Sequence, residues 1–165
     1  MPLAIRRFPD SILKERTKSV DEIDTRVRAL INRMIDLMRR QPHCVGLAAP
    51  QIGSSARIAV MDATGHPKVK ESRGLIVLVN PLVEQAEGRV VGREGCLSVP
   101  DFTGNVARAA RVRVTALDQF RVRFTVTLEG FEAVVAQHEI DHLDGMLFLD
   151  RVVSPTDVFR RKTYL

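Results

Sequence analysis

Apolar residues between positions 20 and 40 recur at spacings of three and four, so they fall on one face of an α-helix. Gln41-Pro42 follows directly, and a proline cannot continue the helical hydrogen-bond ladder. The pattern therefore predicts an N-terminal amphipathic helix over residues 20–40, with an apolar face more typical of core packing than of membrane contact. That face consists of Ile23, Val27, Leu30, Ile31, Met34, Ile35 and Met38.

Farther along the chain, a period of two residues indicates β-strands. Apolar and polar residues alternate throughout 121–129 and again over 112–116, and residues 118–120 between them favour an antiparallel hairpin. Two shorter β-branched runs, 57–61 and 74–79, predict further strands. The second of these is expected to end at the Asn-Pro pair that follows it, and the residues between the two runs are expected to form a loop.

The last periodic segment predicts a helix over residues 130–143, which ends where Gly145 suits the left-handed conformation of a C-cap. Strands gathered before one long helix, without a repeated strand–helix–strand rhythm, favour the α+β class. We expect mixed or antiparallel β-sheets packed around this central helix. The length of 165 residues predicts a single domain over 1–165.

Composition excludes several classes of protein. Hydrophobic residues make up 45% of the chain and charged residues 27%, close to globular averages, so disorder is not indicated. No apolar stretch approaches the roughly 18 residues that cross a bilayer, and the N-terminal residues lack the apolar core of a signal peptide. We therefore expect a cytoplasmic protein that does not associate with a membrane.

The formal net charge of +5 favours contact with acidic surfaces such as the ribosome. The chain has no dense basic run with interleaved aromatic residues, so specific nucleic-acid binding is not expected. Arg160, Arg161 and Lys162 offer a basic cluster for a transient ribosome contact, although an ordinary solvated tail explains these residues at least as well.

The candidate chemistry lies in the last predicted helix, where residues 137–142 read QHEIDH. His138 and His142 are four positions apart, so both imidazoles leave the same helix face and can converge on one metal ion. Glu139 would lie beside that ion without binding it, where it can accept a proton from a bound water and return it to a leaving group. The pattern indicates a metal-dependent hydrolase.

A catalytic site of this type usually has three protein ligands, so one ligand is still to be found. The residues after His142 contain no His or Cys, and the better candidates lie upstream: Cys44, Cys96, His43, His66 and several carboxylates. Spacing moderately favours Cys96, because Gly95 lets the backbone come close and Leu97 presents a backbone N–H that can stabilise a developing oxyanion.

Three motifs occur in order along the chain: GLAAPQ at 46–51, EGCLS at 94–98 and QHEIDH at 137–142. Together they resemble the peptide deformylases, and the likeness extends over nearly the whole chain, including VPDFTGNVAR at 99–108 and DGMLFLDR at 144–151. Any one motif is only suggestive, whereas three in this order are highly specific.

The resemblance implies one divalent metal ion held by Cys96, His138 and His142, which would make the central helix a metal-binding one. Fe²⁺ is expected natively, and Zn²⁺, Ni²⁺ or Co²⁺ can often occupy the site in this family. The implied activity is that of a peptide deformylase, a metallohydrolase that removes the formyl group from the N-terminal formylmethionine of nascent polypeptides and releases formate.

The resemblance also implies roles around the metal. Glu139 would carry the proton, while the Gln51 side chain and the Leu97 backbone N–H would donate to the oxyanion. N-formylmethionyl nascent peptides would bind in extended form near Gly46, with the methionine side chain in an apolar pocket. The candidate lining residues are Val45, Phe131, Val134 and Val135, for which plain core packing is the alternative.

Two further expectations concern the motifs themselves. Glu94 and Arg108 would form a structural ion pair that steadies the cysteine loop. Cys44 stands where family members usually have glycine, so it adds a side chain near the substrate path and disfavours a positive φ. We expect an active enzyme nonetheless, because the three ligands and Glu139 are all present.

Two other functions compete with this interpretation. An endopeptidase would use the same chemistry, but it would need a third ligand downstream of His142 and a cleft open on both sides of the scissile bond. A non-enzymatic, ribosome-associated protein that retains the fold would fit the basic charge and the presence of Cys44.

Overall fold

The computed structural model describes residues 4–162 of the chain. Within that part, neither α-helix is long and apolar enough to cross a membrane. The helical elements are η1 (Ser11–Lys14), α1 (Thr25–Arg40), η2 (Ala49–Ile52), α2 (Gly130–Leu143) and η3 (Phe148–Arg151). The strands are β1 (Gly46–Ala48), β2 (Ile58–Met61), β3 (Ile76–Glu87), β4 (Val90–Cys96), β5 (Val99–Arg108), β6 (Arg111–Leu117), β7 (Arg123–Glu129) and β8 (Val158–Arg160).

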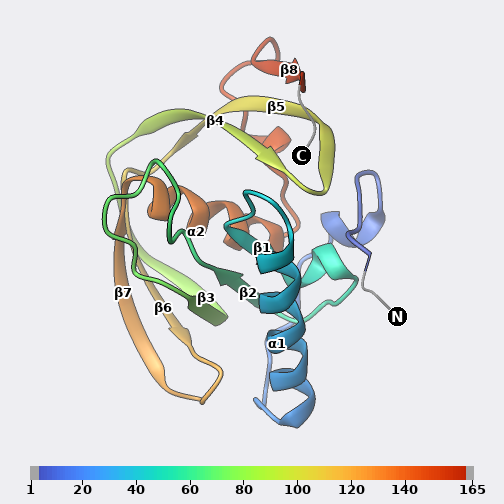
Figure 1. Ribbon diagram of the computed structural model, residues 1–165, viewed down its shortest axis with the longest axis vertical. Coiled ribbons are helices and arrows are strands. Elements are labelled where there is room, and N and C mark those ends of the chain that lie inside the picture. The colour runs from blue at the N-terminus through green and yellow to red at the C-terminus, as the bar shows by residue number, and fades with distance from the viewer. Residues whose placement is uncertain (1–3, 163–165) are drawn as a thin grey trace.

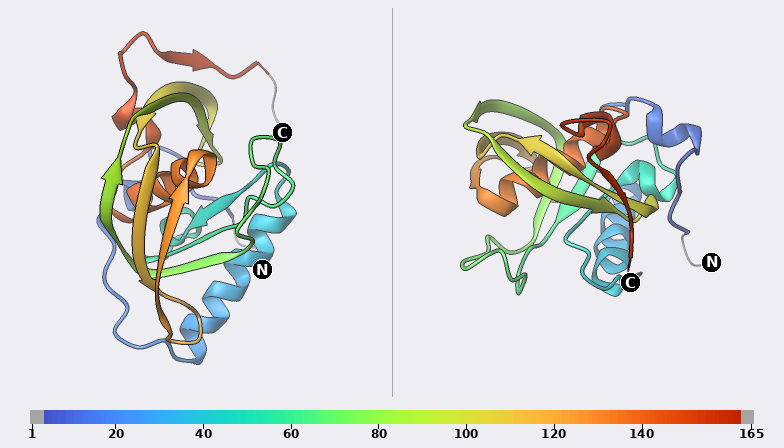
Figure 2. Two further views of the ribbon diagram at one scale, coloured as in Figure 1. Left: turned by 90° about the vertical axis from the view of Figure 1, so that its left-hand side faces the viewer. Right: turned by 90° about the horizontal axis from the view of Figure 1, so that it is seen from above.

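The strands form two sheets, and α2 lies between them (Figures 1 and 2). The larger sheet has the strand order β1-β2-β3-β6-β7, and the smaller one has the order β4-β5-β8. All neighbouring strands pair antiparallel. This arrangement confirms the predicted α+β class with antiparallel sheets and few helices.

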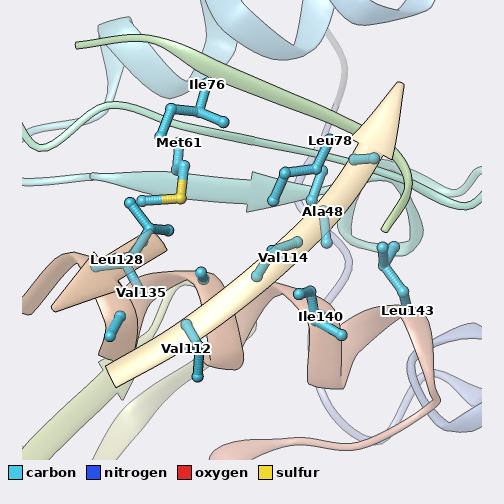
Figure 3. Close-up of a cluster of buried hydrophobic side chains, with 14 residues drawn as sticks. Ala48, Met61, Ile76, Leu78, Val112, Val114, Leu128, Val135, Ile140 and Leu143 are labelled. Atoms are coloured by element: carbon cyan, nitrogen blue, oxygen red, sulfur yellow. The ribbon is translucent and has the colours of Figure 1, made fainter. Parts of the chain in front are cut away.

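Helices cover both faces of the larger sheet. Successive side chains of a strand point to opposite faces, and in β2 Ala59 and Met61 pack with α2 whereas Ile58 and Val60 pack with α1. Figure 3 shows the side that faces α2, where helix residues such as Ile140 meet the side chains of the strands. Burial on both faces explains why β2 is apolar throughout instead of alternating.

Two elements have nearly the bounds that the sequence predicts. Helix α2 spans Gly130–Leu143, and Gly145 beyond it has a φ of 76°, as expected for a left-handed C-cap. The hairpin of β6 and β7 is also present, with Arg113 opposite Thr127, although β7 begins at Arg123 and not at residue 121.

Helix α1 begins at Thr25 and not at residue 20, so the predicted start was wrong. The Asp24 side chain caps it by accepting a hydrogen bond from the Val27 backbone at 2.9 Å. The Asn80 side chain binds both the N–H and the carbonyl of Val20, at 2.8 Å each. These tertiary hydrogen bonds keep the chain before Asp24 extended, and they cannot be read from local periodicity.

Strand β3 runs through the Asn80-Pro81 pair at which the sequence pattern ends it. Asn80 has a φ of 51°, and the pairing with β6 shifts register between Val79 and Leu82. A bulge of this kind accommodates a proline because the hydrogen-bond ladder is already interrupted there. The predicted end of the strand was therefore wrong for a local geometric reason.

The smaller sheet contains the EGC of the second motif and has no clear alternation in its sequence. In the hairpin of β4 and β5, Cys96 pairs with Val99, so only two residues form the turn. Strand β8 adds to the other side of β5, with Phe102 opposite Arg160. Residues Val158–Arg160 therefore belong to a sheet, although the Arg160 side chain remains exposed.

Candidate metal centre

Helix α2 brings several polar side chains into the interior of the molecule. It follows β7 through Gly130, whose φ of 60° turns the chain sharply, and it packs against the larger sheet. Glu139 is 5% exposed and His142 is 1% exposed. Polar groups buried to this extent need partners or a chemical role, because desolvation is costly.

Cys96 reaches the two histidines from the smaller sheet. It is the last residue of β4, and its Sγ lies 3.3 Å from Nε2 of His142. The ligand atoms of Cys96, His138 and His142 all lie within 4.8 Å of one another. A thiolate with two imidazoles is a donor set that suits a divalent zinc- or iron-type ion.

A buried ionic network holds these side chains in position. Glu94 accepts a hydrogen bond from Nδ1 of His138 at 2.8 Å, and Arg108 donates two bonds of 2.9 Å to Glu94. Arg108 also contacts Asp141 at 2.5 Å, and Arg151 binds the same carboxylate at 2.6 Å. Because a carboxylate can only accept, Nδ1 of His138 carries the proton and Nε2 is free for a metal. The expected ion pair of Glu94 and Arg108 is present, within a longer chain of charges.

The electrostatics of the centre favour the ionised donors. Burial opposes ionisation of Cys96, but the charges and hydrogen bonds of His142 and His138 outweigh it and hold the thiol pKa well below its usual value. Burial would also raise the pKa of Glu94, yet the hydrogen bonds from Arg108 and His138 lower it to about 2. These shifts favour the thiolate form of Cys96 and the carboxylate form of Glu94.

Glu139 lies beside the three donors, and its Oε1 is buried without a hydrogen-bond partner among residues 4–162. Burial raises its pKa against the opposing charges of His138 and His142. Gly46 packs directly against this side chain, since a Cβ at that position would come within 2.6 Å of Oε2 of Glu139. A buried carboxylate oxygen without a partner, beside a metal donor set, fits a group that exchanges a proton with a bound water.

Gln51, on η2, approaches the Cys96 sulfur. Its Oε1 accepts a hydrogen bond from the Ala48 backbone at 3.0 Å, which turns Nε2 toward the Cys96 sulfur at 3.5 Å and the Ser98 hydroxyl at 3.2 Å. Leu97 lies in the turn between β4 and β5, directly after Cys96. The predicted oxyanion donors therefore flank the cysteine.

A cavity of about 530 Å³ opens onto the centre, within the size range of small-ligand sites. Its lining includes every residue that the sequence predicts for substrate binding: Val45, Gly46, Phe131, Val134 and Val135. Val135 is 5% exposed and also belongs to the core against the larger sheet, so core packing and cavity lining both apply to it. Cys96, Gln51, Leu97, His138 and Glu139 line the same cavity.

The other candidate ligands lie outside the cluster of donors. The ring of His66 stacks on Phe131, with 4.2 Å between the ring centroids, and Lys68 Nζ lies 5.4 Å from the same ring. His43 lines the cavity without joining the donors. Of the two cysteines, Cys96 is the one that lies with the histidines.

Cys44 has a different environment from Cys96. Its thiol donates to the carbonyl of Gly46 at 3.2 Å, and burial together with the charge of Glu139 raises its pKa to about 12. Cys44 has no positive φ; the left-handed residue is its neighbour His43, with a φ of 59°. The backbone therefore does not need the freedom of glycine at this position, and the predicted conflict with φ does not arise.

Sequence reasoning missed the role of Asp141 and the cavity residues of the loop before β3. Asp141 is 6% exposed and joins Arg108 to Arg151. Its spacing of three from His138 on one helix was the only available signal. His66 and Lys68 belong to a segment without periodicity, so nothing in the sequence places them against Phe131.

A thiolate and two helical imidazoles beside a buried glutamate, at a cavity in an α+β fold, have the arrangement of a mononuclear metallohydrolase. Residues 2–158 match the family model described as Polypeptide deformylase. The chain is 46% identical over 151 residues to the peptide deformylase of Halothermothrix orenii, an alignment that covers 92% of this chain and 94% of that protein. The chain therefore belongs to the peptide deformylase family, hydrolases that remove the N-formyl group from nascent polypeptides.

Other relatives and solved structures agree with this assignment. The chain is 40% identical over 162 residues to the peptide deformylase of Thermodesulfovibrio yellowstonii, covering 97% of this chain and 95% of that protein. A crystal structure of a peptide deformylase from Legionella pneumophila matches with a TM-score of 0.84 at 44% identity, over 94% of this chain and 88% of that chain. The Met-Ala-Ser-bound peptide deformylase from Acinetobacter baumannii matches with a TM-score of 0.85 at 32% identity, over 92% of this chain and 99% of that chain.

Proposed function

We propose that this protein is a metal-dependent amidase that removes the formyl group from the N-terminal formylmethionine of nascent polypeptides and releases formate. The observation that carries the proposal is the approach of Cys96, His138 and His142 to within 4.8 Å of one another, beside the buried Glu139. Family membership supports the reaction, and this centre offers the groups that the reaction needs.

Cys96, His138 and His142 would hold one divalent ion on α2, the helix between the two sheets. One thiolate and two imidazoles suit Fe²⁺, which we expect natively, and also Zn²⁺, Ni²⁺ or Co²⁺. When bound, the ion would supply a water with a pKa of about 7 and polarise the formyl oxygen. Glu94 would keep His138 oriented toward the ion through its hydrogen bond to Nδ1.

Residues of the chain would carry the proton and stabilise the developing charge. Glu139 accepts the proton of the attacking water and delivers it to the amine nitrogen that leaves. Its raised pKa suits both halves of this transfer, because the group must be protonated and deprotonated in each turnover. Gln51 Nε2 and the Leu97 backbone N–H donate to the oxygen that becomes negative.

The cavity wall suggests how the peptide lies. Strand β4 is at an edge of the smaller sheet, and the cavity is lined by the unbroken run 90–97, so the unpaired edge of this strand forms one wall. An extended peptide would bind along this edge and along Gly46, with its methionine side chain among Val45, Phe131, Val134 and Val135. The Met-Ala-Ser-bound structure of the Acinetobacter baumannii relative supports a methionyl peptide as the ligand.

We also propose that residues 1–165 form one catalytic domain, that it acts in the cytoplasm, and that it contacts the ribosome transiently. The family match over residues 2–158 supports the single domain. The net charge of +5 supports contact with an acidic particle, since such a charge raises the rate of encounter.

The test is formate release from formyl-Met-Ala-Ser by protein purified anaerobically and loaded with Fe²⁺. We expect turnover that is lost when the metal is removed and restored when Fe²⁺ or Co²⁺ is added. If protein with its metal site fully loaded released no more formate than a sample without enzyme, the proposal would be contradicted. Cleavage of internal peptide bonds in its place would indicate an endopeptidase.

A further inference from the structure

Arg161 brings a positive charge to the catalytic cavity from the C-terminal end of the smaller sheet. It follows β8 directly, and its backbone N–H continues the pairing with β5 by donating to the Asp101 carbonyl at 2.8 Å. Its guanidinium lies over Gly95, since a Cβ at Gly95 would come within 2.3 Å of Arg161 Nη2. Gly95 directly precedes the metal-ligand candidate Cys96, so the Arg161 guanidinium lies next to the metal centre.

The guanidinium of Arg161 has no carboxylate partner within the part of the chain that the structure describes, and its Nε is buried without a hydrogen bond. The neighbouring cation Arg93 differs, because it donates to Asn105 and lies 3.9 Å above the ring of Phe159. Burying part of a charged group without a partner is unfavourable. Arg161 is therefore available to bind an anionic group that enters the cavity.

The alternation of β4 defines which part of a bound peptide would meet Arg161. Glu94 and Cys96 are buried toward α2, while Arg93 and Gly95 point to the opposite, exposed face. A peptide added to the unpaired edge of β4 alternates in the same way. If its methionine points toward the apolar wall formed by α2, the next side chain points to the face where Arg161 lies.

We propose that Arg161 is a specificity-determining residue that binds an acidic side chain at the position immediately after formylmethionine. This inference rests on the proposed deformylase function and refines its substrate class. A guanidinium binds a carboxylate through two parallel hydrogen bonds, a geometry that a lysine on a flexible stem cannot reproduce. Substrates with Asp or Glu as their second residue are favoured over those with the neutral amides.

The experiment compares two C-terminally amidated peptides, formyl-Met-Glu-Ser and formyl-Met-Gln-Ser, as substrates of the metal-loaded full chain. The measured quantity is the ratio of their kcat/KM values, so each variant supplies its own reference rate. For the unmodified chain we expect a ratio of about three to ten in favour of Glu, carried mainly by KM, as for one partly exposed charge pair. The ratio falls toward one at high salt, because ions screen the pair.

The decisive variants are Arg161→Met and, as a second neutral replacement, Arg161→Gln. Both are expected to bring the ratio to about one. Arg160→Met is the matched control: it removes the same charge from the adjacent residue, which is exposed and points to the other face of β8. This control is expected to keep the ratio of the unmodified chain.

Several outcomes would overturn the inference. A ratio near or below one for the unmodified chain, a ratio that persists in both Arg161 variants, or an equal loss in Arg160→Met would each do so. These failures are distinguishable from a failure of the proposed function. If the protein is not a deformylase, formyl-Met-Gln-Ser gives no formate. If only the role of Arg161 is wrong, formyl-Met-Gln-Ser is turned over, but formyl-Met-Glu-Ser is not preferred to it.

Discussion

At the scale of single residues, the close fit between Gly46 and Glu139 restricts which residue can stand at position 46. Any side chain at Gly46 would occupy space that the Glu139 carboxylate fills, because a Cβ would come within 2.6 Å of Oε2. Gly46 has no positive φ, so glycine is required there for space and not for backbone conformation. The first motif and α2 are therefore in direct contact at this point, with no room for a larger residue at Gly46.

Gly46→Ala is expected to lower formate release at least about tenfold while the metal stays bound, because displacement of Glu139 disturbs proton transfer but not the ligands. The control is the double variant Gly46→Ala/Glu139→Gln, in which the alanine should add little further loss if it acts through Glu139. Steady-state kinetics with metal analysis of the single and double variants provide the check. A full additional loss of about tenfold in the double variant would show that the contact with Glu139 is not the cause.

Glu139→Ala is expected to keep the metal and to lose about a hundredfold or more in kcat, because removal of a general base or acid typically costs this much. Glu139→Gln keeps the volume of the side chain and should show the same loss. Metal content per chain and formate release are measured together. Loss of the metal from either variant would mean that Glu139 is a ligand.

The two cysteines provide a matched pair of serine substitutions. Cys96→Ser should bind metal poorly, because it replaces a thiolate ligand, whereas Cys44→Ser should retain it. Cys44 should also react slowly with iodoacetamide at pH 8, since burial raises its pKa to about 12 and leaves a neutral thiol at that pH. Fast alkylation of Cys44, or loss of metal from its serine variant, would contradict this assignment.

At the scale of secondary-structure elements, the centre is a junction between α2 and the hairpin of β4 and β5. Arg108 on β5 is 5% exposed and bridges Glu94 on β4 to Asp141 on α2. These three buried charges compensate one another, so the junction depends on all of them. The same bridge orients the His138 ring, which couples the packing of the elements to the geometry of the ligands.

Arg108→Met is expected to destabilise the fold by about 3–5 kcal/mol, because it removes the buried cation that Glu94 and Asp141 share and leaves only the more exposed Arg151 on Asp141. Arg111→Met is the control on the next strand. Arg111 and its partner Glu129 are 54% and 67% exposed, and an exposed pair contributes about 0–1 kcal/mol. Chemical denaturation of both variants gives the comparison. Similar losses would show that burial of the network does not matter for stability.

At the scale of the whole molecule, the metal would join the smaller sheet to α2, with Cys96 from β4 and the two histidines from the helix. Any ion that binds only the folded state stabilises it by mass action, by about 4 kcal/mol at a thousand times its dissociation constant. For a domain of this size, that corresponds to a rise in Tm of roughly 10 °C. Calorimetry with and without Co²⁺ or Zn²⁺ tests this, and the Cys96→Ser variant should show little rise.

Local patterns predicted the elements that are regular along their own length. Helix α2 and the hairpin of β6 and β7 follow from periodicity and from glycine positions, and the QHEIDH and EGCLS motifs indicated where the ligand candidates lie. Features that depend on distant contacts were not predictable. Asn80 binds Val20 and delays the start of α1, and β8 forms only because β5 offers it an edge.

Because the candidate ligands lie far apart along the chain, they are synthesised, and can fold, at different times. Cys96 contacts His142 across 46 residues, and a chain emerges from the ribosome with its N-terminus first. The hairpin of β4 and β5 can thus form while His138 and His142 are still unmade, when no imidazole yet holds the pKa of the Cys96 thiol low. Metal binding by these three residues would have to follow the synthesis of α2. A protein that acts on newly made chains would therefore be inactive until its own α2 has been made.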